Sequence, residues 1–188
     1  MKIGLIIVGI LLLVGLLFGG SMVGTRNDLV QQRETISRAW ADVDNDLQRR
    51  ADLIPNLVET VKGYAKQEQE VFSNIANARS ALLNARSPEQ SLEANARLEG
   101  ALGRLLVLTE NYPELKSNTN FLRLQDQLEG TENRIHQSRR RYNEAVQKYN
   151  TSIDLFPNNV AAALFGFHRN DAYFKADPGS RTAPKVAF

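Results

Sequence analysis

Charged side chains gather on neighbouring turns of a predicted helix at Asp42, Asp46, Arg49 and Arg50. Asp46 and Arg50 are spaced i,i+4, so they can form an ion pair. The cluster predicts either a polar contact with a partner, made by Arg49 and Arg50, or a solvated face of ion pairs worth about 0.3–0.5 kcal/mol each. Arg50 fits the solvated face poorly because it lies on an apolar stripe, where a buried charge must be paired.

The same stretch holds Asp42, Asp44, Asp46 and Asp52, which could suggest a metal site. Residues two apart on a helix point to different sides, however, and no EF-hand glycine or terminal glutamate follows. The chain has no cysteine and two histidines. No nucleophile triad or phosphate loop can be assembled, and no carboxylate pair stands out among 21 acidic residues. We therefore expect no metal ligand, no cofactor, no catalytic residue and no enzyme activity.

One basic run, Arg139-Arg140-Arg141, could contact the phosphates of lipid headgroups or of nucleic acid, or could form a solvated face. The net charge of +2 is too balanced for a dedicated nucleic-acid protein, so no such partner is predicted. Nearby, His136 has Glu132 and Arg140 at i±4 and no second histidine, so this spacing does not indicate a metal site.

An uncharged segment from Ile3 to Val23 contains 21 residues between Lys2 and Arg26. As a helix it would be roughly 31 Å long, which matches the hydrocarbon core of a bilayer. A cleaved signal peptide is the alternative, but the run is long for its apolar region. Residues 1–24 are therefore predicted to be a transmembrane anchor.

Small residues recur along this anchor at Gly15 and Gly19, and again at Gly20 and Gly24. This spacing lets two membrane helices approach closely and predicts a homo-oligomer, although glycine is also common in membrane helices. Arginines soon after the anchor favour a cytoplasmic bundle by the positive-inside rule, but a long domain can be exported despite them.

A long apolar seam follows the anchor. It steps alternately by four and three residues, and 13 of its 16 positions are apolar. The positions are Leu29, Arg33, Ile36, Trp40, Val43, Leu47, Arg50, Ile54, Leu57, Val61, Tyr64, Glu68, Val71, Ile75, Ala78 and Leu82. This period, near that of a coiled coil, predicts a helix. Pro55 could mark a turn, but the seam keeps its phase across it, so we predict one helix over 25–85 that is kinked at Pro55.

Three further helices are predicted, over about 88–112, 118–154 and 159–165, with Ser87 as a cap. The fold class is therefore all-α, with a bundle over 25–168 and a tail over 169–188. Aromatic residues that include Phe165 and Phe167 either cap the end of the bundle or form a docking site for a partner. Phe188, in the tail, is a further candidate contact.

Several motifs resemble those of the bacterial LemA family in order along nearly the whole chain. They are residues 38–44 (RAWADVD), 47–64 (LQRRADLIPNLVETVKGY), 100–105 (GALGRL), 112–116 (YPELK), 132–135 (ENRI), 142–158 and 165–167 (FGF). Asn45-Asp46 and Gln67-Glu68 depart from the usual pattern. The resemblance implies a single-pass membrane anchor, an antiparallel bundle of long helices and no established catalytic residue.

Together these features favour a non-enzymatic scaffold in the bacterial inner membrane. It would self-associate or organise membrane partners, which are the lipid bilayer, further copies of the chain or other membrane proteins. The alternative is a membrane-tethered sensor that binds a ligand between its helices, with a pocket near Arg50 or Glu68.

Overall fold

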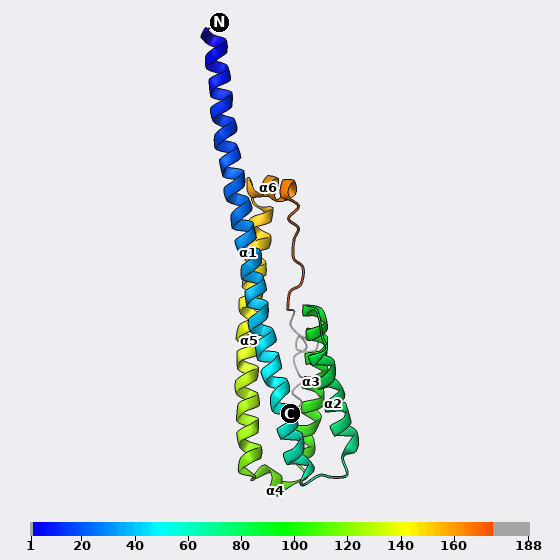
Figure 1. The fold of residues 1–188 in the computed structure, drawn as a ribbon. Helices are drawn as coiled ribbons and strands as arrows, with labels where there is room; N and C mark the ends of the chain where they lie inside the picture. The colour runs from blue at the N-terminus through cyan, green and yellow to red at the C-terminus, as the bar shows by residue number, and fades with distance from the viewer. Residues whose placement is uncertain (1, 175–188) are drawn as a thin grey trace, which may run out of the picture. The chain divides into compact units, whose positions relative to one another are not determined.

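A computed structural model describes residues 2–174 of the chain, and within this range it contains helices and no strand. The helices are α1 (Lys2–Lys62), α2 (Gln69–Leu83), α3 (Pro88–Thr109), α4 (Pro113–Lys116), α5 (Thr119–Asp154) and α6 (Asn158–Phe165) (Figure 1). The predicted all-α class is confirmed.

The helices belong to two compact units. Within the described residues, unit 1 combines residues 2–38 with 143–171, and unit 2 combines residues 39–142 with 172–174. Helices α1 and α5 each contribute a segment to both units. This division differs from the predicted boundaries after residues 24 and 168. Those boundaries separate a membrane anchor, a bundle and a tail, and they remain a prediction.

Helix α1 continues through Pro55, as the constant phase of the apolar seam predicts. The prediction that this helix extends to residue 85 is wrong, because α1 ends at Lys62. The amide groups of Tyr64 and Ala65 both donate to the Val61 carbonyl at 3.0 Å, which closes the last turn. Gly63, a poor helix former, begins the connection to α2.

The chain reverses direction after α1, so α2 lies antiparallel to the end of α1 in unit 2 (Figure 1). The two halves of the seam therefore sit on two helices rather than on one. Ile54, Leu57 and Val61 of α1 are buried, and so are Ile75 and Leu82 of α2. The seam thus marks the core correctly even though the helix that carries it is interrupted.

Pro55 explains a contact between α1 and α2. Proline has no amide hydrogen, so the carbonyl of Ala51, four residues earlier, lacks its helical donor. Arg79 of α2 supplies one, since its Nε donates to the Ala51 oxygen at 2.7 Å. Ala51 is fully buried, so this carbonyl would otherwise lose its hydrogen bond to water without a replacement.

Helix boundaries after α2 follow local signals. The Ser87 hydroxyl accepts from the Gln90 amide at 3.2 Å, and Pro88 occupies the first turn of α3, as predicted. Helix α3 packs against α2 and ends at Thr109, a little before the predicted residue 112. The short α4, which carries the buried Leu115, was not predicted. Asn118 then caps α5 by accepting from the Phe121 amide at 3.1 Å.

The two long helices run antiparallel in each unit, as the family resemblance implies. In unit 2, Asp46 of α1 contacts Ser138 of α5, and Trp40 contacts Tyr142. In unit 1, Thr25 contacts Asn158, just after α5. The buried apolar residues of unit 1 are Met22, Leu29, Ile36, Val146, Tyr149, Ile153, Ala161, Ala162 and Phe167.

The contact between Arg79 and the Pro55 gap predicts a coupling between two substitutions. Arg79→Met should destabilise the protein by about 1–2 kcal/mol, because it leaves the buried Ala51 carbonyl without a donor. In a Pro55→Ala background the new amide bonds that carbonyl, so the same change should cost about 1 kcal/mol less.

Urea unfolding of the full-length chain in detergent, followed by circular dichroism, measures both costs. Arg104→Met, on an exposed part of α3, serves as the control and should change stability by less than about 0.5 kcal/mol. If Arg79→Met destabilised the protein equally in both backgrounds, Arg79 would not stabilise it by replacing the hydrogen bond that Pro55 removes.

Candidate functional site

A polar cluster with a buried centre and exposed outer members lies where α1, α3 and α5 meet in unit 2. We call it the Arg50 cluster, and its members are Arg50, Asn95, Glu99, Glu132 and His136. The Nη1 of Arg50 donates to the Asn95 Oδ1 at 3.0 Å and lies 2.7 Å from the Glu132 Oε2. The other carboxylate oxygen of Glu132 lies 3.2 Å from the His136 Nε2, an ion pair when the imidazole is protonated.

Each inner member of the cluster occupies a polar position within an apolar helix face. Arg50 lies between Leu47 and Ile54 on the apolar seam, and only 6% of it is exposed. On α3, Asn95 precedes the fully buried Leu98 by one turn and is itself buried. Helical spacing therefore directs these side chains inward, where a guanidinium must find polar partners.

Glu132 holds the same kind of position on α5, one turn before the fully buried Ile135. It brings the compensating negative charge, and its side chain keeps 24% exposure. The expectation that Arg50 must be paired is thus confirmed. Its predicted partner was wrong, since the Asp46 carboxylate instead accepts from the Ser138 hydroxyl at 2.5 Å.

Two carboxyl groups share the positive charge of Arg50. The pKa of Glu99 is raised above its ordinary value of 4.5, first by partial burial of its carboxyl and then by the charge of Glu132, to which it is hydrogen-bonded. Arg50 and Arg139 oppose this shift. The folded state therefore holds the proton of the Glu99 carboxyl more tightly than the unfolded state does. As the pH rises from 4.5 to the raised pKa, the contribution of Glu99 to the free energy of unfolding falls.

One donor of the cluster has no acceptor within residues 2–174. The Nε of Arg50 is buried, and no acceptor in this range meets it. A buried donor without an acceptor is costly, about 1–3 kcal/mol.

Most of the other charged residues that the sequence singled out lie at the surface. Asp42 and Arg49 are exposed, and so are Arg140 and Arg141, whereas Arg139 is half-buried with its guanidinium 4.9 Å from the Phe174 ring. No group of three possible metal ligands occurs among the described residues. Whether Arg49 or Arg50 contacts a partner remains a prediction, with Arg50 already engaged inside unit 2.

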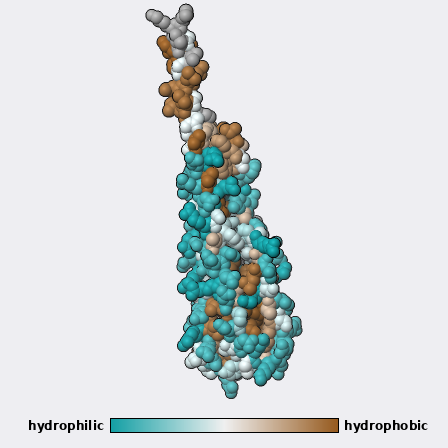
Figure 2. All heavy atoms as spheres, viewed as in Figure 1, coloured by the Kyte–Doolittle hydropathy of each residue, from teal (hydrophilic) through white to brown (hydrophobic). Residues whose placement is uncertain are grey.

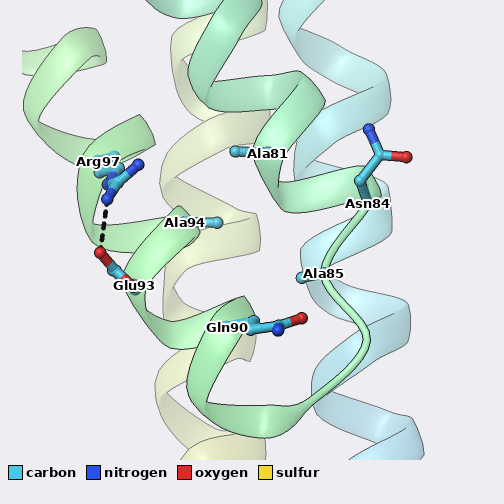
Figure 3. Close-up of a pocket in the computed structure, with 7 residues that line it drawn as sticks. All are labelled: Ala81, Asn84, Ala85, Gln90, Glu93, Ala94 and Arg97. Atoms are coloured by element: carbon cyan, nitrogen blue, oxygen red, sulfur yellow. Dashed lines mark hydrogen bonds and ion pairs between the residues drawn. The ribbon is translucent and has the colours of Figure 1, made fainter.

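A small hollow separates α2 and α3, and Figure 3 shows its walls. Its volume is about 180 Å³, below the 300–1,000 Å³ typical of ligand pockets. The lining residues are Ala81, Asn84, Ala85, Gln90, Glu93, Ala94 and Arg97. Neither Arg50 nor Glu68 lines it, so it is not the pocket that a sensor was predicted to contain.

The predicted membrane anchor forms the first part of α1. A helical segment here is long and apolar enough to cross a membrane. Among the side chains that the structure describes between residues 6 and 17, the large apolar ones are exposed, for example Ile6 at 60% and Leu17 at 68%. Gly15, Gly19, Gly20 and Gly24 are also exposed, and a Cβ built on any of them would meet nothing within 4 Å. Gly15 and Gly19 thus leave one face of the helix, the glycine face, uncovered in the single chain, and Gly20 and Gly24 leave another uncovered, roughly 140° around the helix.

The predicted aromatic contacts lie in different surroundings in unit 1. Phe165 is 39% exposed, and the Arg26 guanidinium lies 5.9 Å from its ring. Phe167 is buried, with Arg33 at the same distance from its ring. This segment therefore covers part of the helix pair, which agrees with capping, and still leaves aromatic surface exposed. Phe188 lies outside the described residues.

Sequence reasoning did not single out Asn95, Glu99 or Phe174. Asn95 could have been found as a polar residue on the apolar face of α3, and Glu99 follows it at i,i+4. Phe174 stacks on Trp40 at 5.9 Å and meets the edge of Tyr142 at 5.3 Å in unit 2. No local pattern indicates that contact, because Phe174 lies in a segment without periodicity.

The Arg50 cluster predicts a large cost for removing its negative partner. Glu132→Ala leaves a buried guanidinium without its counter-ion, so it should destabilise the protein by about 2–3 kcal/mol, less than for a fully buried pair because Glu132 keeps some exposure. The matched control is Glu93→Ala, which removes an exposed ion pair with Arg97 and should cost less than about 1 kcal/mol. Urea unfolding of the full-length chain in detergent compares the two, and equal costs would contradict a structural role for the cluster.

Comparisons with known proteins agree with the motifs of the sequence. Protein LemA of Metamycoplasma hominis is 27% identical over 155 residues, which cover 82% of this chain and 70% of that protein. Magnetosome protein MamQ 2 of Paramagnetospirillum magneticum is 27% identical, and magnetosome protein MamQ of Magnetospirillum gryphiswaldense is 25% identical. Each of these alignments covers 83% of this chain and 66%, just under two thirds, of the relative. The family model described as LemA family matches residues 39–188, so the chain belongs to the LemA family.

Proposed function

We propose that this chain is a membrane-anchored helical scaffold, without enzyme activity, that self-associates and organises partners at the bacterial inner membrane. The observation that carries the proposal is the exposed apolar segment at the start of α1. A helix with that much apolar surface is stable in lipid and unfavourable in water. In unit 1 the same helix continues into a packed pair with α5, which joins the anchor to a folded body.

The comparisons support a membrane role. Several relatives bear the name magnetosome protein, and we extend from them to this chain the idea of a protein that serves a membrane-bound structure. The Arg50 cluster supports a structural role because its charges join three helices to each other. A single-pass anchor with the bundle on the cytoplasmic side follows from the arginines after the span.

Self-association is proposed to use the glycine face of the anchor. Gly15 and Gly19 lie one turn apart with no side chain over them, so a second copy of the helix can approach closely there. Without a hydrophobic driving force in lipid, such packing depends on small residues, and a bulky side chain would prevent it.

Substitution of this face tests the scaffold. In full-length protein reconstituted in bilayers, wild type should crosslink or show energy transfer between copies, and the double change Gly15→Leu with Gly19→Leu should reduce that signal several-fold. Gly9→Leu is the control, since it lies about 120° around the helix from Gly15. A wild-type protein that is monomeric at all protein-to-lipid ratios would contradict self-association through the anchor.

A ligand-sensing module is the second candidate, and the buried, unpaired Nε of Arg50 favours it. A guanidinium with a free donor can bind a small carboxylate or phosphate between helices. Thermal-shift measurements with such anions on the full-length protein should then show specific stabilisation that Arg50→Lys removes. Equal shifts in wild type and variant would reflect general salt effects and exclude this site.

A further inference from the structure

We propose that α6 and the two residues that follow α5 form a second membrane contact, which lies in the headgroup layer beside the end of the transmembrane span. We call this surface the α6 patch, and it consists of Leu155, Phe156, Val160, Leu164 and Phe165. The inference rests on the proposed membrane anchor and adds a lipid-binding surface to it.

The α6 patch exposes more apolar surface than a water-facing segment normally does. Phe156 is 80% exposed and Leu164 is 71% exposed, and Leu155 is 56% exposed. Figure 2 shows a brown, hydrophobic area over α6, and the brown anchor of α1 rises above it. Contiguous exposed apolar patches of this kind mark surfaces that bind a partner or a membrane.

Local structure explains why this face points outward. Ala161 and Ala162 of α6 are buried in unit 1, whereas Val160 and Leu164, spaced i,i+4, share the uncovered face. Gly166 ends α6 with a φ of +71°, which turns the chain so that Phe167 packs inward. One face of α6 therefore packs against unit 1, and the opposite, apolar face is exposed.

The contacts of α6 with α1 set its level relative to the bilayer. The Thr25 hydroxyl donates to the Asn158 Oδ1 at 3.3 Å, and Arg26 lies over Phe165. The uncharged span ends at Val23, and Thr25 lies only about 3 Å farther along the helix axis. Since the headgroup layer is several ångströms thick on each side of the bilayer, α6 lies within it when the span is in lipid.

Composition favours lipid over a protein as the occupant of the patch. No charged side chain occurs from residue 155 to residue 167, between Asp154 and His168. Such a segment offers no ion pair to a protein partner, but its aliphatic and aromatic side chains suit the boundary between headgroups and acyl chains.

Depth-dependent fluorescence quenching tests the proposal, and the absence of cysteine allows one probe per variant. Full-length Leu164→Cys is labelled with an environment-sensitive fluorophore and reconstituted in phosphatidylcholine–phosphatidylglycerol vesicles. The control is Gln147→Cys, at an exposed position of α5 about 12 Å before Leu155 along the helix. A third probe, at Leu12→Cys, reports on the span itself.

We expect lipid-borne spin labels to quench the Leu164 probe several-fold more than the Gln147 probe, and aqueous iodide to show the opposite order. Iodide quenching of Leu164 equal to that of Gln147 would overturn the proposal, as would shielding of Leu164 from both quenchers, which would indicate a protein occupant. The Leu12 probe separates the two claims: a quenched Leu12 with an unquenched Leu164 refutes only the α6 contact, whereas an unquenched Leu12 refutes the anchor.

Discussion

The buried guanidinium of Arg50 imposes a requirement that α1 cannot meet alone. Its immediate helical neighbours on the seam are apolar, so its partners must come from other helices: Asn95 from α3 and Glu132 from α5. A buried charge without such partners would be strongly destabilising, so unit 2 can pack only in an arrangement that brings all three helices together at this level. The apolar contacts around the cluster supply most of the favourable burial, but they are less selective about which residues face each other.

A second constraint of the same kind acts one turn away. Pro55 frees the carbonyl of Ala51, and the Arg79 side chain from α2 donates to it. In both features a buried polar group of α1 finds its hydrogen-bond or ion-pair partner on another helix. Each also links α1 to a helix that follows it in the chain, so polar groups rather than apolar area alone specify how the helices of unit 2 are paired.

Unit 1 relates the folded body to the membrane. The same α1 that carries the exposed apolar segment packs against α5 from about Thr25 onward, and α6 closes this pair next to the end of the span. The uncovered apolar side of α6 and the uncovered glycine face of the anchor are both surfaces that a water-soluble protein would hide. Both surfaces suit the membrane scaffold that we propose.

Spacing along the chain was enough to identify the helical class, the apolar seam, the cap at Ser87, and a span long enough for a bilayer, because each of these depends on residues within a few turns. The position of Arg50 on the seam even indicated that it needed a partner. Local spacing could not identify that partner, since Glu132 lies far along the chain, while the nearer Asp46 bonds to Ser138. The end of α1 at Lys62 also depended on packing: the apolar period is the same whether the chain continues straight or turns back, and burial of Ile75 and Leu82 on α2 favours the turn.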